Sequence, residues 1–169
     1  GIGTASRRVD GGTVGVLVAA NGGEPQRLSV NGIPVGRWLA GQTALPPSRR
    51  RTFAAVIMTD APLLPGQLNR LALRAAFGLI RVGLVDEQTT TGTILAVSTT
   101  GLDDDMPGLA AGTVTARQTP EAGLPALFAA AADAGEEGVL NAIVAAHAQN
   151  TTSGVPGLAI DAFRGAASP

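Results

Sequence analysis

The chain has 169 residues, of which 45% are hydrophobic, and a formal net charge of −1 at pH 7. This apolar content suffices for one hydrophobic core, and the charge balance gives no reason to expect a nucleic acid or an anionic membrane as partner. The absence of cysteine excludes disulfide bonds and thiolate metal sites, and an aromatic content of 3% is too low for the base-stacking platforms of single-strand-binding proteins.

The first part of the chain predicts strands. Residues 4–9 and 13–20 are β-prone runs separated by a turn with two glycines, a pattern that indicates a hairpin. Residues 28–30 and 35–39 are short runs that would extend the same sheet. Residues 53–58 are continuously apolar over the length of a strand, which favours a strand buried on both faces.

The second part predicts two helices with a strand between them. Residues 65–82 repeat apolar side chains at helical spacing, with a proline suited to the first turn and Gly83 suited to the end. Residues 124–146 place mostly small side chains on one face, and residues 93–99 read as the intervening strand. A weak helical segment is expected at residues 161–164. The predicted apolar face of the first helix comprises Leu68, Leu71, Ala72, Ala75, Ala76, Leu79 and Ile80.

Thr52 is the main candidate for a catalytic residue. It follows residues 42–51, which hold two prolines, a serine and three arginines and are typical of an exposed, cleavable connection. Cleavage just before Thr52 would place a hydroxyl and a free α-amino group on one residue, and the amine can accept the hydroxyl proton without a histidine. The chain has a single histidine, His147, which leaves little for a Ser-His-Asp arrangement. The alternative is a β-branched residue that simply begins a strand.

Two further polar residues stand at predicted strand ends. Asn21 closes the strand at residues 13–20 and precedes Gly22 and Gly23. Its amide could act as an oxyanion donor, which is worth about 2.7–4 kcal/mol in a dry site, or the segment could be an ordinary Asn-Gly-Gly turn. Asp60 follows a buried strand and is expected to cap nearby N–H groups, including those at the helix entry.

Several motifs agree with one known family in the same order along the chain. They lie at residues 1–7, 13–21, 32–37, 59–72, 91–99 and 138–146. Together they resemble the DmpA family of L-aminopeptidase/D-esterase enzymes, which are self-processing N-terminal-nucleophile hydrolases. The resemblance covers nearly the whole chain. It implies a mixed α/β (α+β) fold, a four-layer αββα sandwich of the DmpA type, of which this chain supplies the C-terminal part.

The resemblance also implies a division of the chain and roles for three residues. Self-cleavage before Thr52 would make residues 1–51 the C-terminal part of an α subunit and residues 52–169 a β subunit, both within one domain. Thr52 would be the nucleophile and the α-amine base, Asn21 the oxyanion stabiliser, and Thr91 the hydroxyl that orients the nucleophile. No cofactor and no metal is implied.

Two positions depart from the family pattern. Thr93 stands where relatives carry an acidic residue, and a threonine cannot hold a cationic α-ammonium group as a carboxylate can. Asp86 or Glu87 in the adjacent loop is a candidate substitute. Arg51 stands where self-cleaving relatives have glycine or asparagine, which favours the interpretation that residues are missing between Arg51 and Thr52.

The implied function is cleavage of an amide through an acyl-enzyme formed on Thr52. A threonine nucleophile resembles the branch that contains pantetheine hydrolases of carbapenem biosynthesis, so the substrate would be a small-molecule amide such as a pantetheine amide, or an N-terminal peptide bond. Two alternatives stay open. One is an ornithine acetyltransferase-like acyl transfer, and the other is an unprocessed, inactive relative that acts as a structural or binding domain.

The expected partners follow from the same resemblance. They are the remaining N-terminal part of the precursor, an amide substrate and further αβ units in a homo-oligomer, with no nucleic acid and no membrane. No run approaches the roughly 18 apolar residues of a membrane span, and no secretory signal opens the chain. All 12 basic residues are arginine, which suggests a GC-rich bacterial genome, and we expect a cytoplasmic protein.

Overall fold

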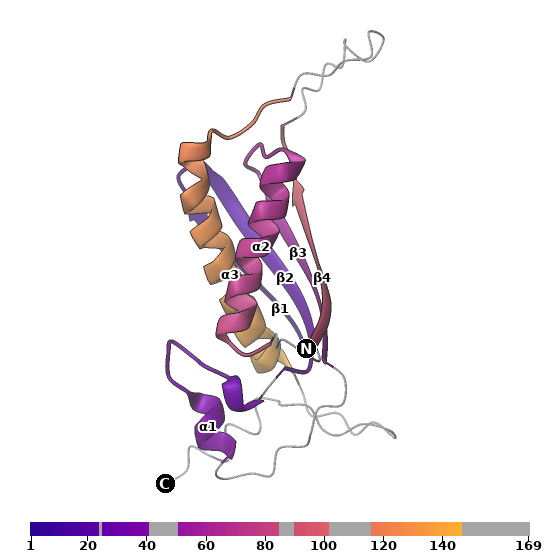
Figure 1. Ribbon diagram of the computed structural model, residues 1–169, viewed down its shortest axis with the longest axis vertical. Coiled ribbons are helices and arrows are strands. Elements are labelled where there is room, and N and C mark those ends of the chain that lie inside the picture. Colours follow the sequence, from indigo (N-terminus) through magenta and orange to yellow (C-terminus); the bar gives the residue numbers. More distant parts are fainter. Residues whose placement is uncertain (24, 41–50, 85–89, 102–115, 147–169) are drawn as a thin grey trace.

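The computed structural model describes residues 1–23, 25–40, 51–84, 90–101 and 116–146. It shows one four-stranded sheet with two long helices, α2 (Pro65–Arg81) and α3 (Leu124–Ala145), packed on one face (Figure 1). Several sequence predictions lie outside the described residues. They concern 42–50, Asp86, Glu87, His147 and 161–164.

The predicted hairpin is confirmed. Strands β1 (Ile2–Val9) and β2 (Gly12–Asn21) pair antiparallel, with Val9 opposite Gly12. The turn between them needs residues with positive φ, and Gly11 and Gly12 have φ values of 102° and 146°. Glycine adopts such values without steric cost, so the two glycines close the hairpin.

The two further strands extend the sheet from β2. Strand β3 (Arg51–Thr59) pairs antiparallel with β2, and strand β4 (Thr90–Ser98) pairs parallel with β3, so the strand order is β1-β2-β3-β4. Helix α2 lies between β3 and β4 in the sequence, as the crossover between parallel strands requires. The predicted strands at 53–58 and 93–99 are therefore confirmed.

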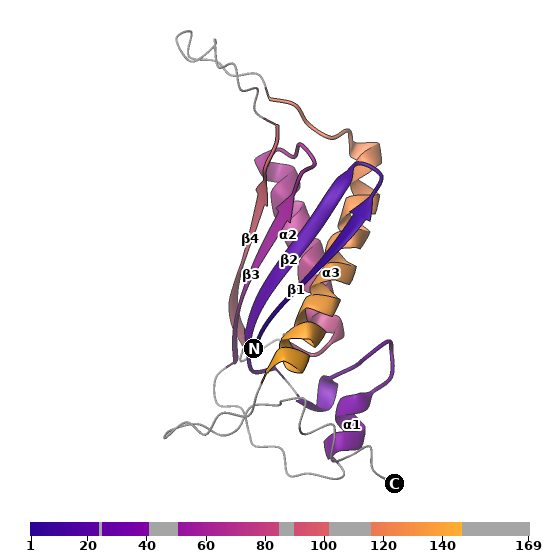
Figure 2. The same ribbon diagram turned by 180° about the vertical axis from the view of Figure 1, so that it is seen from behind.

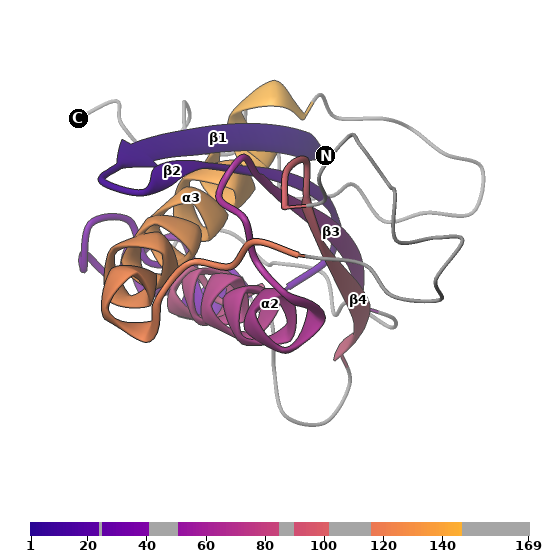
Figure 3. The ribbon, with the colours of Figure 1, turned by 90° about the horizontal axis from the view of Figure 1, so that it is seen from above.

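Within the described part of the chain, the strand at 53–58 is buried on one face and not on both faces, as its sequence had predicted. Ala55, Ile57 and Thr59 are at most 2% exposed, whereas Ala54 is exposed and Met58 is 48% exposed. The helices cover only one side of the sheet, as the view in Figure 3 shows. Because side chains alternate along a strand, every second residue of β3 faces the uncovered side.

The expectation that residues 28–30 and 35–39 extend the sheet is also wrong. Asn31 and Gly32, with φ values of 51° and 78°, turn the backbone so that Val30 forms an isolated bridge with Ile33. The chain then enters the short helix α1 (Val35–Ala40), which packs with the 3-10 turn η1 (Pro25–Arg27) beyond the end of the sheet (Figure 2). The backbone thus pairs with itself instead of with β1 or β2.

Helix α2 begins and ends where its sequence predicts. Pro65 occupies the first turn, and Gly83 follows the helix with φ 77°. The first turn is capped by Gln67, whose Oε1 accepts a hydrogen bond from Leu64 N at 3.1 Å and whose Nε2 donates to Thr119 O at 2.8 Å. Both side-chain polar atoms of this buried glutamine are thus satisfied.

Asp60 does not cap this helix. Its Oδ1 accepts a hydrogen bond of 2.6 Å from Thr13 N at the start of β2, and its backbone oxygen accepts one of 2.6 Å from Thr100 Oγ1. Its expected structural role is present, but the N–H group belongs to a neighbouring strand. Asp60 therefore fixes the end of β3 to β2.

The core lies between the sheet and the two helices. Leu71, Ala75 and Leu79 of α2 are fully buried, but the predicted core residue Ile80 is 51% exposed, because it lies roughly half a turn away from Leu71. Helix α3 presents the small-residue face that its sequence predicts. Its buried residues are Leu124, Leu127, Ala130, Ala131, Ala132, Ala134, Gly135, Gly138, Val139 and Ala142.

Small residues let the two helices approach closely. A Cβ atom added at Gly78 of α2 would lie closer than 3.0 Å to Ala132 O and Glu136 N of α3. Arg81 crosses the same contact and forms ion pairs with Asp133 at 3.2 Å and Glu136 at 3.3 Å.

Among the described residues, no helix is long and apolar enough to cross a membrane.

We expect Gly78→Ala to destabilise the protein, with Gly66→Ala as its matched control in the same helix. The added methyl group at Gly78 meets backbone atoms that cannot move aside, so unfolding should require about 1–3 kcal/mol less in chemical denaturation. Gly66 has nothing within 4 Å of an added Cβ, so alanine there should leave stability unchanged or raise it by up to about 1 kcal/mol. Equal stability of the two variants would contradict close α2–α3 packing.

Candidate active site

Three of the predicted site residues lie in one row across the sheet. Thr52 on β3 is directly opposite Asn21 on β2 and directly opposite Thr91 on β4. Side chains opposite each other on neighbouring strands point to the same face of a sheet. All three residues are exposed, and the row lies on the face away from α2 and α3. The fold therefore brings together residues that are far apart in the sequence.

Thr93 belongs to the next row along the same face. It is opposite Ala54 on β3, two residues beyond Thr52. A hydroxyl therefore occupies this position of β4, where the family resemblance leads us to expect a carboxylate. Asp86 and Glu87, the suggested substitutes, fall outside the described part of the chain.

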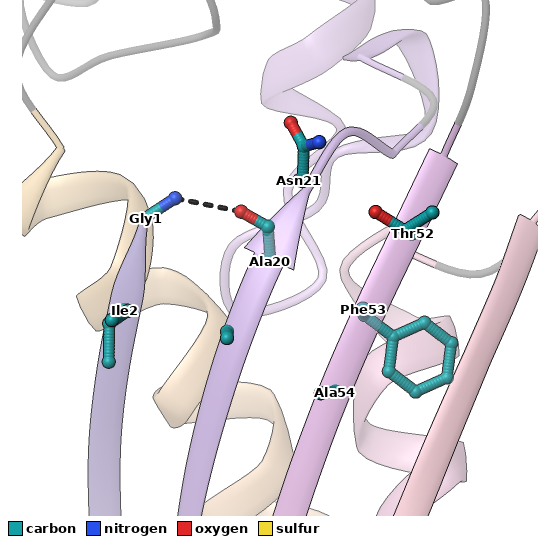
Figure 4. Close-up of a pocket in the computed structure, with 8 residues that line it drawn as sticks. Gly1, Ile2, Ala20, Asn21, Thr52, Phe53 and Ala54 are labelled. Atoms are coloured by element: carbon teal, nitrogen blue, oxygen red, sulfur yellow. Dashed lines mark hydrogen bonds between the residues drawn. The ribbon is translucent and has the colours of Figure 1, made fainter.

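A pocket of about 470 Å³ opens beside the row. Figure 4 shows that the Thr52 hydroxyl points toward β2, the strand that carries Asn21, whereas the Phe53 ring points toward β4. The pocket is bounded by the ends of β1, β2 and β3. Its lining residues are Gly1, Ile2, Ala19, Ala20, Asn21, Thr52, Phe53 and Ala54.

The backbone around the pocket is held by strand pairing. Gly1 N donates a hydrogen bond of 2.7 Å to Ala20 O, and Ala20 N donates one of 2.8 Å to Gly1 O. None of the side chains that line the pocket carries a charge. The lining side chains thus offer one hydroxyl and one amide among apolar groups, and the Gly1 amine is the charged group among the described lining.

The segment after Asn21 turns sharply, as the alternative interpretation of this residue predicts. Gly22 and Gly23 have φ values of 116° and 120°. A Cβ atom at Gly23 would lie 3.1 Å from Gly83 O, so the turn passes close to the end of α2. Asn21 stands in the row immediately before this turn and lines the pocket, with its side chain projecting at the end of β2 (Figure 4).

Arg51 and Thr52 are consecutive residues of β3, so Thr52 is not a chain terminus in this structure. The interpretation that residues are missing between them stays a prediction. Ile2, Ala19 and Ala54 were not predicted as site residues. The strand register would have indicated them. Ala19 is two residues from Asn21, and Ala54 is two residues from Thr52, on the same face of the sheet.

Comparison with known proteins identifies the family. The model of peptidase family S58 matches residues 1–156. The chain belongs to this family. It is 41% identical over 180 residues to the beta-peptidyl aminopeptidase BapA of Sphingosinicella microcystinivorans, an alignment that covers 95% of this chain and 44% of that protein. The chain therefore spans less than half the length of this S58 relative.

Solved structures agree in fold. A beta-aminopeptidase from Burkholderia sp. superposes with a TM-score of 0.77 at 37% identity, over 100% of this chain and 50% of the other. The L-aminopeptidase D-Ala-esterase/amidase of Ochrobactrum anthropi, described as a variant of the Ntn hydrolase fold, superposes with a TM-score of 0.80 at 32% identity, over 98% of this chain and 47% of the other. The predicted DmpA-like family and the mixed α+β fold are thereby confirmed.

Proposed function

We propose that this S58 chain is part of a self-processing N-terminal-nucleophile hydrolase that cleaves amides with Thr52. The observation that carries the proposal is the row of Asn21, Thr52 and Thr91 beside the pocket. Cleavage before Thr52 would divide the chain into 1–51 and 52–169 and create the α-amino group that the mechanism needs. The names of the S58 relatives, a beta-peptidyl aminopeptidase and a beta-aminopeptidase, support amide hydrolysis.

The proposed mechanism assigns one task to each residue of the row. The α-amine of Thr52 accepts the proton of its own hydroxyl, and the hydroxyl oxygen attacks the substrate carbonyl carbon. The Asn21 side-chain amide donates to the oxyanion of the tetrahedral intermediate. The amine then returns the proton to the leaving nitrogen, and water releases the acyl group from Thr52. Thr91 lies on β4, on the side of Thr52 away from the strand toward which the hydroxyl now points, and would orient the hydroxyl once cleavage leaves Thr52 free to turn.

The lining of the pocket favours a substrate with an uncharged group next to the scissile carbonyl. Ile2 on β1, Ala19 on β2 and Ala54 on β3 supply apolar surface. A small-molecule amide, of which a pantetheine amide is one example, and an N-terminal peptide bond with an aliphatic side chain both satisfy this condition. Acyl transfer to an amine in place of water would use the same acyl-enzyme.

Thr93 favours one competing function, that of an uncut binding or structural domain. Thr93 offers no carboxylate to stabilise a protonated α-amine on Thr52. This slows any step of the mechanism in which the amine carries the proton. The competing function predicts an intact chain and no Thr52-dependent turnover. The two candidate functions therefore differ in whether the peptide bond before Thr52 is cut, which can be measured.

Intact-mass analysis and hydrolysis assays of the full-length protein test the nucleophile. We expect a new N-terminus at Thr52 in the wild type, and an uncut chain without amide hydrolysis in Thr52→Ala. Thr4→Ala is the matched control, because Thr4 is an exposed threonine on β1 of the same sheet. Unchanged hydrolysis in Thr52→Ala would refute the mechanism. A cut at another position would assign the nucleophile to another residue.

Asn21→Ala should lower kcat of the processed enzyme by about 10²–10³-fold with little change in KM, because the amide acts on the transition state. Rates are normalised to the fraction of chains cut before Thr52. Asn69→Ala, on the exposed surface of α2, should leave kcat unchanged. A loss of thermal stability in Asn21→Ala without a loss of kcat would favour the turn interpretation.

We further propose that the remaining N-terminal part of the precursor covers the open face of the sheet. This face exposes Ile2 (64%), Leu17 (37%), Met58 (48%) and Leu95 (55%), one or more large apolar side chains from each strand. Sheets bury such a face against another layer. A second sheet with its helices would complete the four-layer sandwich, and the chain's coverage of about half of the S58 relatives leaves enough sequence for it.

Met58→Glu tests the covered face. A carboxylate buried between two sheets is costly, so in the full-length protein the two parts should separate on size-exclusion chromatography or fail to accumulate. Leu73→Glu is the matched control, because Leu73 is a 61% exposed apolar residue on α2, away from the sheet. If Met58→Glu assembles as well as Leu73→Glu, the precursor does not cover this face.

A further inference from the structure

The ring of Phe53 occupies the space that a side chain at Gly92 would need. The two residues are directly opposite each other on β3 and β4. A Cβ atom built at Gly92 would lie closer than 3.0 Å to ring carbons Cδ1, Cε1 and Cζ of Phe53, a separation that real Cβ atoms do not show. Figure 4 shows the ring directed from β3 toward β4.

This contact lies immediately beside the candidate catalytic row. Phe53 follows Thr52, Gly92 follows Thr91, and the two pairs are successive rungs of the same parallel ladder. Alternation places the Phe53 ring on the helix side of the sheet, where it packs against the hydrophobic core, and places both threonine side chains on the opposite face. The ring therefore connects the core to the backbone of both strands next to Thr52.

Glycine destabilises a strand, and an aromatic residue on the neighbouring strand can compensate for this. Gly92 has no side chain to pack and loses more backbone freedom on folding than other residues. Strand β4 pairs only with β3 among the described strands, so that ladder is its one connection to the rest of the described sheet, beside its packing against the core. An aromatic ring laid over a glycine on the adjacent strand restores a cross-strand contact.

We propose that the Phe53–Gly92 contact is a positioning device that holds Thr52 and Thr91 opposite each other. Glycine at position 92 admits the ring, and the ring fixes the separation and twist of β3 and β4 at the level of the nucleophile. Phe53 and Gly92 are positioning residues, because the Phe53 ring packs against the core and Gly92 has no side chain and is not among the residues that line the pocket. The inference rests on the proposed role of Thr52.

Gly92→Ala in the full-length protein is the first test. The added methyl group should force the ring aside and shift β4 against β3, which lowers both kcat and the rate of cleavage before Thr52 by roughly tenfold to a hundredfold. KM should stay within about twofold, because Gly92 is not among the residues that line the pocket. Gly66→Ala, with open space around its added methyl group, should keep the wild-type kcat and cleavage rate.

A second variant separates positioning from a general loss of stability. Phe53→Val keeps an apolar, strand-forming side chain but removes the three ring carbons that conflict with a methyl group at position 92. The kcat and cleavage rate of the double variant Phe53→Val/Gly92→Ala should therefore stay within about threefold of those of Phe53→Val alone, as expected for two residues that interact directly. A double variant in which the two losses multiply, so that it is much slower than either single variant, would overturn the proposal.

The remaining outcomes are assigned as follows. If Thr52→Ala keeps the turnover and cleavage of the wild type, the proposed function itself is refuted. Thr52-dependent turnover together with wild-type kcat in Gly92→Ala refutes only the positioning role. If Gly92→Ala does not fold by circular dichroism, Phe53→Val decides alone: a fall in kcat at unchanged KM supports the inference, and a wild-type kcat overturns it.

Discussion

The position of β3 between β2 and β4 is the constraint on which the rest of the structure depends. Its antiparallel pairing with β2 sets Asn21 opposite Thr52, and its parallel pairing with β4 sets Thr91 opposite the same residue. The parallel pair exists because α2 carries the chain across the sheet between the two strands. The close contact of α2 with α3 at Gly78 in turn holds the crossover helix on the sheet. The candidate site thus depends on packing that lies on the other face.

The alternation of side chains gives β3 two separate tasks. Ala55, Ile57 and Thr59 point into the core below the helices, and Thr52, Ala54 and Met58 point to the uncovered face. Core packing can therefore fix the backbone without competing for the space in which a substrate would bind. The same alternation explains why Phe53, next to Thr52 in sequence, contacts the strand partner on the opposite side of the sheet.

Local sequence signals predicted much of the fold. Gly11 and Gly12 identify the hairpin, and the apolar spacing identifies both long helices. The predictions failed where tertiary structure decides. The short segment 35–39 suits a strand or a helix, and the turn at Asn31 and Gly32 selects the helix. Burial on both faces at 53–58 could not be judged without knowing that one helical layer is present. Asn21 and Thr91 were named through the family resemblance, but their common row with Thr52 depends on register, which no local pattern contains.

Hydrogen bonds at the far end of β3 bear on its register. Asp60 accepts from Thr13 N, and Thr100 Oγ1 donates to Asp60 O, so this end of the strand is fixed to both of its neighbours' ends. Sliding β3 by one residue would turn Thr52 toward the helices, and sliding it by two would put Ala54 opposite Asn21. The hydrogen bonds at this end thus help to set the register of the whole strand. A carboxylate remote from the pocket helps to determine which residue is presented there.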